Sequence, residues 1–129
     1  MALVAFVTLL ALLEYVGISV LVSRARGRYG VKAPATSGHE IFERYFRVQQ
    51  NTVEQLLLFL PSLWIFSSYV SAPIGALLGL VFIAGRAIYL RAYVAEPSQR
   101  SVGFLLSFAP SAVMLVGGLV GTALAALRG

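Results

Sequence analysis

Residues 43–70 read ERYFRVQQNTVEQLLLFLPSLWIFSSYV, so that a dense polar and charged run continues without a break into an apolar one. Charges this close to membrane depth are expensive, and in membrane proteins they usually mark a site. At about 100° per residue, the side chains of Arg47, Asn51 and Glu54 fall within a narrow arc of a helix. A cation, an amide and an anion on one stripe could hold a small zwitterion. Taken alone, the same residues could equally form a structural ion pair between helices.

The composition around this stretch indicates a membrane protein. Of the 129 residues, 59% are hydrophobic and 12% are charged, and the mean hydropathy is +0.86. A soluble domain carries about twice this share of charge. A membrane-spanning helix needs about 20 apolar residues, and the chain supplies four such stretches. We therefore predict an all-α, integral membrane four-helix bundle that forms a single domain, residues 1–129, with helices at about 2–23, 41–68, 73–94 and 101–127.

The first of these stretches, MALVAFVTLLALLEYVGISVLVSRARG, has the position of a secretory signal. It lacks a basic segment at its start, and its apolar part is too long for such a signal. We therefore expect it to stay in place as a first transmembrane helix. Within it, Glu14 lies mid-span, where we expect it to be protonated or paired at a subunit interface, because a lipid-facing carboxylate costs several kcal/mol.

The basic residues are sorted to one side of the predicted bundle. With four spans, the first and third connections share a side, and nine of the ten basic residues lie there: Arg24, Arg26, Arg28, Lys32, Arg44, Arg47, Arg86, Arg91 and Arg100. By the positive-inside rule this side is cytoplasmic, which opens the site toward the cytoplasm and places both termini on the opposite side. Arg24, Arg28 and Lys32 could be topology determinants and nothing more. The pI near 10.1 then reflects topology, and no nucleic-acid partner is expected because no aromatic and basic array is present.

The sequence gives no indication of a metal site. The chain has no cysteine, which excludes disulfides, thiolate metal sites and a cysteine nucleophile. Its single histidine, His39, follows a glycine in a polar loop. A lone loop histidine is more often solvated than a ligand, so we expect no metal.

A second group of polar residues is predicted on the third helix. Arg86, Tyr89 and Tyr93 recur at spacings of three and four, so they share one face, and Arg100 follows where the last helix begins. We expect a pocket between the second and third helices that holds the Arg47 stripe and both tyrosines, with arginines at its mouth. Two alternatives remain open. The tyrosines could be interfacial belt aromatics, and Arg44 and Arg86 could neutralise Glu43 or Glu54 instead of touching a ligand.

At these residues the sequence resembles the MAPEG family, the membrane-associated proteins in eicosanoid and glutathione metabolism. FERYFRVQQNTVEQLLLFLPSLW is similar to the signature E-R-x-x-R-x-Q-x-N-x-x-E, and GRAIYLRAY is similar to R-x-x-Y-x-x-x-Y. The resemblance is to the branch that contains the microsomal glutathione S-transferases and cysteinyl-leukotriene synthase, and it extends from the first helix to Arg100. It implies a four-helix bundle that forms a homotrimer and binds glutathione between neighbouring subunits.

The resemblance also implies a role for each residue of the site. Arg100 would stabilise the glutathione thiolate, and Glu54 would receive the glutathione amino group. Arg26 and Gln49 would come from the adjacent subunit. Helix geometry agrees, because Gln49 lies about 160° around the second helix from Arg47. The glutathione-binding set is then Arg26, Arg47, Gln49, Asn51, Glu54, Tyr89 and Tyr93, with Arg100 as the catalytic residue.

Three departures from the branch pattern bear on the substrate. Gln55 stands where the leukotriene synthase has a tyrosine, Gly27 stands at the second of its paired arginines, and Ala112 stands at its tryptophan clamp for a lipid tail. A general membrane-bound glutathione transferase or peroxidase, acting on lipophilic electrophiles or hydroperoxides, therefore fits better than an enzyme selective for a leukotriene epoxide. Glutathione is the expected co-substrate, and membrane lipid and a lipophilic electrophile are the expected partners. The alternative is a non-catalytic, lipid-binding scaffold of the same fold.

Overall fold

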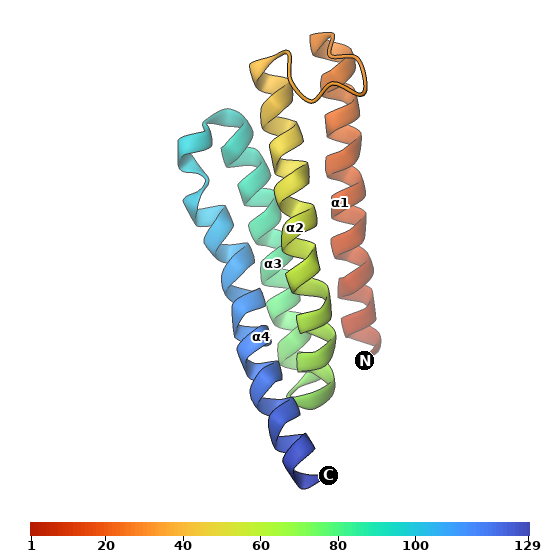
Figure 1. Ribbon diagram of the computed structural model, residues 1–129, viewed down its shortest axis with the longest axis vertical. Helices are drawn as coiled ribbons and strands as arrows, with labels where there is room; N and C mark the ends of the chain where they lie inside the picture. Colours follow the sequence, from red (N-terminus) through yellow and green to blue (C-terminus); the bar gives the residue numbers. More distant parts are fainter.

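The computed structural model describes all 129 residues as an elongated bundle of four long α-helices. The helices are α1 (Ala2–Tyr29), α2 (Glu40–Tyr69), α3 (Ala72–Ala95) and α4 (Ser101–Arg128), and a 3-10 turn, η1 (Pro97–Gln99), precedes α4. They run alternately up and down, so that both termini lie at the end of the bundle opposite the α1–α2 loop and η1 (Figure 1). The predicted all-α fold with four helices is confirmed.

The helix ends show one difference from the sequence prediction. The first helix was predicted to end near residue 23, where the arginines begin, but α1 continues to Tyr29. Arginine is a good helix former, so the arginines extend the helix until Gly30 ends it in the left-handed conformation, with φ of 69°. His39 begins the next helix, because its Nδ1 accepts a hydrogen bond from the Ile41 amide at 3.1 Å. The loop histidine is therefore a helix cap.

Three segments are long and apolar enough to cross a membrane: α1, α3 and the stretch Pro97–Arg128 that contains α4. Large apolar side chains such as Leu9, Leu13, Leu105 and Leu119 are exposed on α1 and α4, as expected of surfaces that face lipid. α2 is not among the three segments, and its first half carries the charges and amides of the 43–55 run. Three of the four predicted spans are thus supported by composition.

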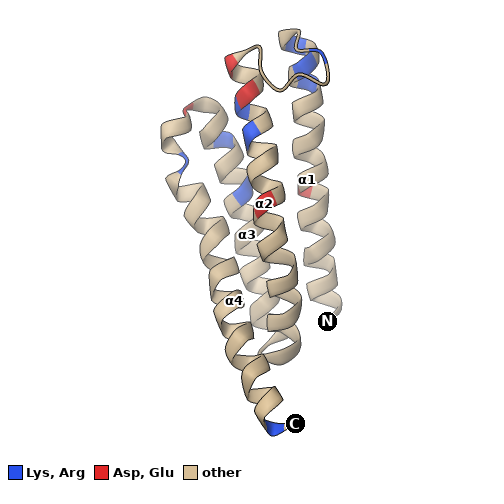
Figure 2. Cartoon of the chain, viewed as in Figure 1, with Lys and Arg blue, Asp and Glu red and all other residues tan.

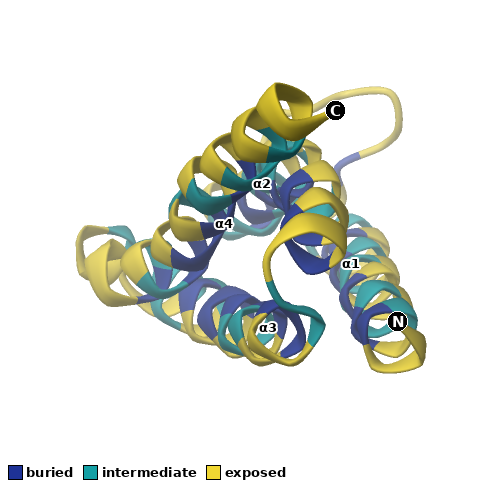
Figure 3. Cartoon of the chain, turned by 90° about the horizontal axis from the view of Figure 1, so that it is seen from below, coloured by how far each residue is buried: buried dark blue, intermediate teal, exposed yellow.

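The two central helices organise the packing. α2 and α3 each contact all the other helices, whereas α1 and α4 lie at opposite edges. Buried residues line the faces that the helices turn toward one another (Figure 3). In the half of the bundle near the termini, the rings of Phe59 and Phe82 stack with centroids 3.8 Å apart, and Leu63 and Met114 are fully buried in the same cluster. This apolar core leaves the polar half of α2 to build a site at the other end.

Two glycines bring α3 and α4 into backbone contact beside that polar half. A Cβ added at Gly85 would lie 2.7 Å from the backbone of Leu106 and Ser107. A Cβ added at Gly103 would overlap the backbone of Tyr89. Small residues allow such close approach between membrane helices. The crossing therefore determines how near α4 lies to Tyr89.

We expect Gly103→Ala to destabilise the bundle by about 1–3 kcal/mol, the usual cost of overpacking, because the new methyl must push α4 away from Tyr89. Thermal unfolding in detergent measures the effect. Gly17→Ala is the matched control, since a Cβ at Gly17 meets nothing within 4 Å. Equal melting temperatures for the two variants would show that the crossing is not tight.

Candidate functional site

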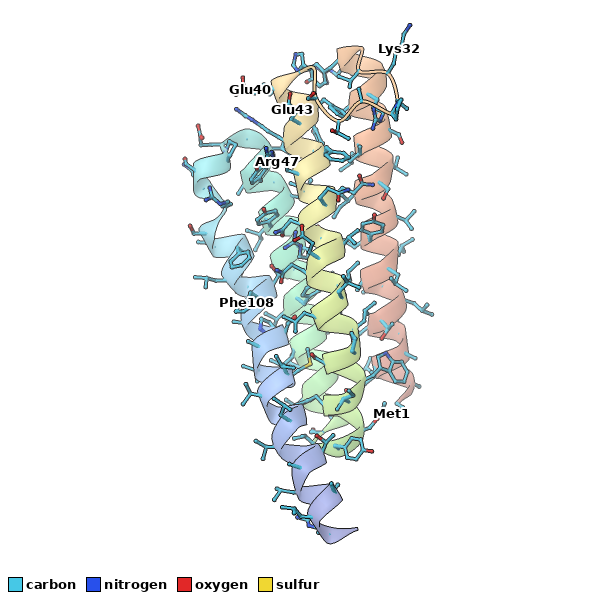
Figure 4. The ribbon with its side chains drawn as sticks, viewed as in Figure 1. Met1, Lys32, Glu40, Glu43, Arg47 and Phe108 are labelled. Carbon is cyan, nitrogen blue, oxygen red and sulfur yellow. The ribbon has the colours of Figure 1, made fainter.

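A cavity of about 430 Å³ lies between α2 and α3 in the half of the bundle away from the termini. Figure 4 shows Arg47 in this upper part of the bundle, on α2 and well above Phe108 of α4. Six sequence-predicted residues line the cavity together with Gln50, which the sequence reasoning missed. The complete lining is Arg47, Gln50, Asn51, Glu54, Tyr89, Tyr93 and Arg100.

The α2 side of the cavity carries one cation and one anion that do not pair with each other. Spacings of three and four residues place Arg47, Asn51 and Glu54 on one face of the helix. The only ion pair in the structure joins Arg44 to Glu40, at 2.8 Å. The interhelical ion pair considered as an alternative is therefore not formed within the protomer. In addition, the Asn51 Oδ1 atom is buried without a hydrogen-bond partner, which leaves an acceptor for a ligand.

The α3 side of the cavity is aromatic. The rings of Tyr89 and Tyr93 stack with centroids 5.5 Å apart and an angle of 23° between their planes. Tyr89 is only 4% exposed, so it lies between helices and not in a lipid-facing belt. Its ring also lies 4.3 Å from the guanidinium carbon of Arg86. Tyr89 is thus held from two sides.

Arg86 is fully buried, at 0% exposure, and holds three helices together. Its guanidinium donates to Thr52 Oγ1 on α2 at 2.7 Å and to Ser107 Oγ on α4 at 3.2 Å. The sequence reasoning expected Arg86 either to neutralise an acidic residue or to touch a ligand. The first expectation was wrong, because Arg86 forms no ion pair and its hydrogen bonds go to two hydroxyl groups. Hydroxyl residues at core positions, Thr52 of α2 and Ser107 of the apolar α4, were the signal that could have indicated this network.

Two other charged residues of the bundle, Arg44 and Glu14, lie away from the cavity. Arg44 donates to the carbonyl oxygens of Val94 at 2.9 Å and Ala95 at 3.3 Å, so it caps the end of α3. Glu14 is half-buried on α1 and forms no ion pair within the protomer. Neither residue lines the cavity.

Arg100 lies at the rim of the cavity, at the junction of η1 and α4. It is exposed, and its guanidinium donates to the Pro97 carbonyl oxygen at 3.1 Å. The backbone of the 3-10 turn therefore holds the guanidinium in place. Arg100 reaches the cavity from the junction of η1 and α4, whereas the other lining residues come from α2 and α3.

A second, more apolar groove of about 480 Å³ adjoins the polar cavity. Asn51, Tyr89 and Arg100 line both, and Phe104 and Leu105 of α4 supply an apolar wall. Ser101 completes the lining of the groove. A polar ligand in the cavity would therefore present one end to an apolar ligand in the groove. The two would meet beside Arg100.

Arg26 and Gln49 lie outside the cavity of their own chain. Gln49 donates through Nε2 to Ser19 Oγ on α1, at 3.0 Å. Arg26 donates to the Ala35 carbonyl oxygen at 2.6 Å and lies over the Phe42 ring. The structure thus places both on another side of the bundle. A contribution to the cavity of a neighbouring subunit stays a prediction.

No group of three or more histidine, cysteine or acidic side chains is arranged to hold a metal ion. What the site offers is a set of guanidiniums, one carboxylate, amides and tyrosines. Such a set suits a small, multiply charged organic ligand.

The fold and this cavity define an all-helical protein with membrane-length apolar helices and an amphipathic ligand site. The chain belongs to the MAPEG family, whose family model matches residues 4–120. It is 46% identical to an uncharacterized protein of Synechocystis sp. over 90% of this chain and 85% of that protein. It is 36% identical to human microsomal glutathione S-transferase 2 over 94% of this chain and 82% of the relative. Identity to bovine leukotriene C4 synthase is 38% over 77% and 66% of the two chains.

Proposed function

We propose that the protein is a membrane-bound glutathione transferase that activates the glutathione thiolate for attack on lipophilic electrophiles or hydroperoxides. The observation that carries the proposal is the junction of the two cavities. The polar one offers Arg47 and Glu54 for the opposite charges of the peptide, and the apolar one offers room for a lipophilic co-substrate at Arg100. Relatives named as a glutathione S-transferase and a leukotriene synthase support the same class of chemistry.

The chemistry asked of the site is thiol activation. A free thiol has a pKa near 8.5, and only the thiolate is a good nucleophile. A guanidinium beside the sulfur stabilises the thiolate, and each pKa unit corresponds to about 1.4 kcal/mol. With an aryl halide, the thiolate forms a carbon–sulfur bond and halide leaves. With a hydroperoxide, sulfur attacks oxygen and the oxygen–oxygen bond breaks, which leaves an alcohol, and a second glutathione completes the disulfide and water.

An assay of the purified protein with glutathione tests the proposal. We expect a thioether product from an aryl halide, and alcohol plus glutathione disulfide from a lipid hydroperoxide. The ratio of the two rates shows whether transferase or peroxidase activity predominates. Loss of both activities together with retained lipid binding would favour the non-catalytic scaffold.

We further propose that α2 completes a four-span topology with the cavity facing the cytoplasm. Basic side chains gather at the end of the bundle that carries the α1–α2 loop and η1 (Figure 2). Arg86, which the sequence prediction counted with them, is instead buried within the bundle, and Arg128 ends α4 at the opposite end. By the positive-inside rule we expect distal termini. A tag placed after Arg128 should be inaccessible from the cytoplasm in intact cells. A tag that reacts there without permeabilisation would reverse the proposed orientation.

The last part of the proposal is a homotrimer with three equivalent sites. Arg47, Gln50 and Glu54 are exposed on the single chain. Their helix, α2, nevertheless packs against the three apolar helices α1, α3 and α4. Exposure of such a stripe to lipid would be costly, and a neighbouring subunit that presents Arg26 and Gln49 would cover it.

We expect native mass spectrometry in mild detergent to show three chains as the main species. Chemical cross-linking in membranes should likewise give dimer and trimer bands with no larger species. A protein that is monomeric in both experiments would contradict the trimer and would leave the site without Arg26 and Gln49.

A further inference from the structure

A third cavity, separate from the two already described, lies beside the end of α1 and the start of α2. Its volume is about 280 Å³, room for roughly nine water molecules at their share of the liquid volume. None of its lining residues belongs to the polar cavity or the apolar groove. They are Leu21, Arg24, Ala25, Arg28, Tyr29 and Tyr45.

The charges of this cavity are uncompensated within the protein. Arg24 and Arg28 lie one helical turn apart, a spacing at which like charges destabilise a helix. Neither forms an ion pair or donates a hydrogen bond to the protein, and no acidic residue lines the cavity. The nearby carboxylates are engaged elsewhere, because Glu40 pairs with Arg44 and Glu43 accepts from the Gly38 amide.

Two tyrosines also line this cavity. The hydroxyl groups of Tyr29 and Tyr45 form no hydrogen bond with the protein, and the two residues come from different helices. The Tyr29 ring is held in place, because it stacks on His39 with centroids 4.1 Å apart and lies 5.6 Å from the Arg28 guanidinium carbon. Two arginines and two tyrosines around one cavity can supply guanidinium and hydroxyl donors, which suit a phosphate group.

The position along α1 identifies the source of the phosphate. Arg24 lies roughly 33 Å along the helix axis from Ala2 at 1.5 Å per residue, whereas the hydrocarbon core of a bilayer is about 30 Å thick. The arginines therefore lie at headgroup level. A shallower groove of about 380 Å³, lined by Val16, Ser19, Val20, Ser23 and Arg24, continues from the same arginine toward the membrane interior. It provides a path for an acyl chain.

We propose that this cavity binds the headgroup phosphate of an anionic phospholipid. Basic pockets between helices at the membrane surface bind anionic headgroups. The net positive charge of the cavity disfavours a choline headgroup, because its ammonium group would lie near two guanidiniums. The site is independent of glutathione, since it shares no residue with the polar cavity.

Native mass spectrometry of the purified protein tests the proposal, after equilibration with equal amounts of phosphatidylglycerol and phosphatidylcholine in detergent. We expect wild type to retain phosphatidylglycerol preferentially. The double variant R24Q/R28Q should lose roughly 30-fold of that preference, the effect of two basic residues at an anionic surface. The matched control is K32Q/R91Q, which removes two exposed basic residues from the same end of the bundle without touching the cavity. It should retain the preference.

Three results would overturn the lipid site. One is a preference unchanged in R24Q/R28Q, and another is an equal loss in K32Q/R91Q, which would show only generic positive charge. The third is displacement of the bound lipid by millimolar inorganic phosphate, which would make a soluble phosphate the occupant. An unchanged melting temperature of R24Q/R28Q shows that the variant is folded, whether or not the protein proves to be a glutathione transferase.

Discussion

Replacement of Arg100 by alanine is expected to lower turnover roughly ten- to a thousand-fold while glutathione affinity stays within a few-fold of wild type. The reason is that the guanidinium interacts more strongly with a thiolate than with a thiol. A group of this kind stabilises the reacting state more than the bound ground state. Its place at the junction of the polar cavity and the apolar groove puts it where sulfur and electrophile would meet.

Two measurements together separate this role from a structural one. Steady-state kinetics should show a fall in kcat with little change in the KM for glutathione. The ultraviolet absorbance of bound thiolate near neutral pH should decrease in parallel. Arg91→Ala is the matched control, because Arg91 is an exposed arginine that lines neither cavity. If Arg100→Ala keeps full activity, thiol activation lies elsewhere, and Tyr93 or Arg26 would be the next residue to test.

Replacement of Arg47 or Glu54 by alanine is expected to weaken glutathione binding by about 2–4 kcal/mol, or roughly 30- to 900-fold. Each would leave one charge of the bound peptide without its partner. The two side chains do not neutralise each other in the structure, so neither loss is offset by releasing the other. Equilibrium binding of glutathione, measured calorimetrically, gives the values directly.

A glutathione analogue that lacks the amino group sharpens this test. Glu54→Ala should bind the analogue as well as wild type does, because the carboxylate has no ammonium to receive. Arg47→Ala should still be weak. Arg24→Ala serves as the charge control, since Arg24 lines a different cavity. Similar losses at Arg24 and Arg47 would mean that the stripe contributes only positive potential.

The sequence predicted most accurately which residues share one face of a helix, because the helical repeat determines this. The 3.6-residue repeat placed Arg47, Asn51 and Glu54 on one face of α2 and the tyrosines on one face of α3, and the structure brings these faces together around one cavity. The close approach of α4 to Tyr89, which depends on Gly85 and Gly103, is a contact between two helices that no single-helix pattern could show. The roles of these residues toward glutathione still await the experiments above.

Other features depend on tertiary structure and were missed for that reason. The partners of Arg86 lie 34 residues before it and 21 after it in the chain, so no local pattern connects them. The apolar groove combines α4 with residues of α2 and α3. The length of α1 beyond residue 23 was underestimated because arginines suggest a loop in a hydropathy pattern, although they favour a helix.

The fully buried Arg86 also has a consequence for how the protein is made. An arginine near the centre of a membrane-spanning helix costs about 2.5–3.5 kcal/mol during insertion. The insertion of α3 is therefore less favourable by about this amount. One hydrogen-bond acceptor, Thr52, has already been synthesised by then, whereas Ser107 emerges from the ribosome later. Until α4 inserts, the α2–α3 hairpin therefore contains Arg86 with only the Thr52 hydroxyl as a hydrogen-bond acceptor. Chains that end before Ser107 would lack this second acceptor, so the Arg86 cation would lie within the membrane with only the Thr52 hydroxyl as an acceptor.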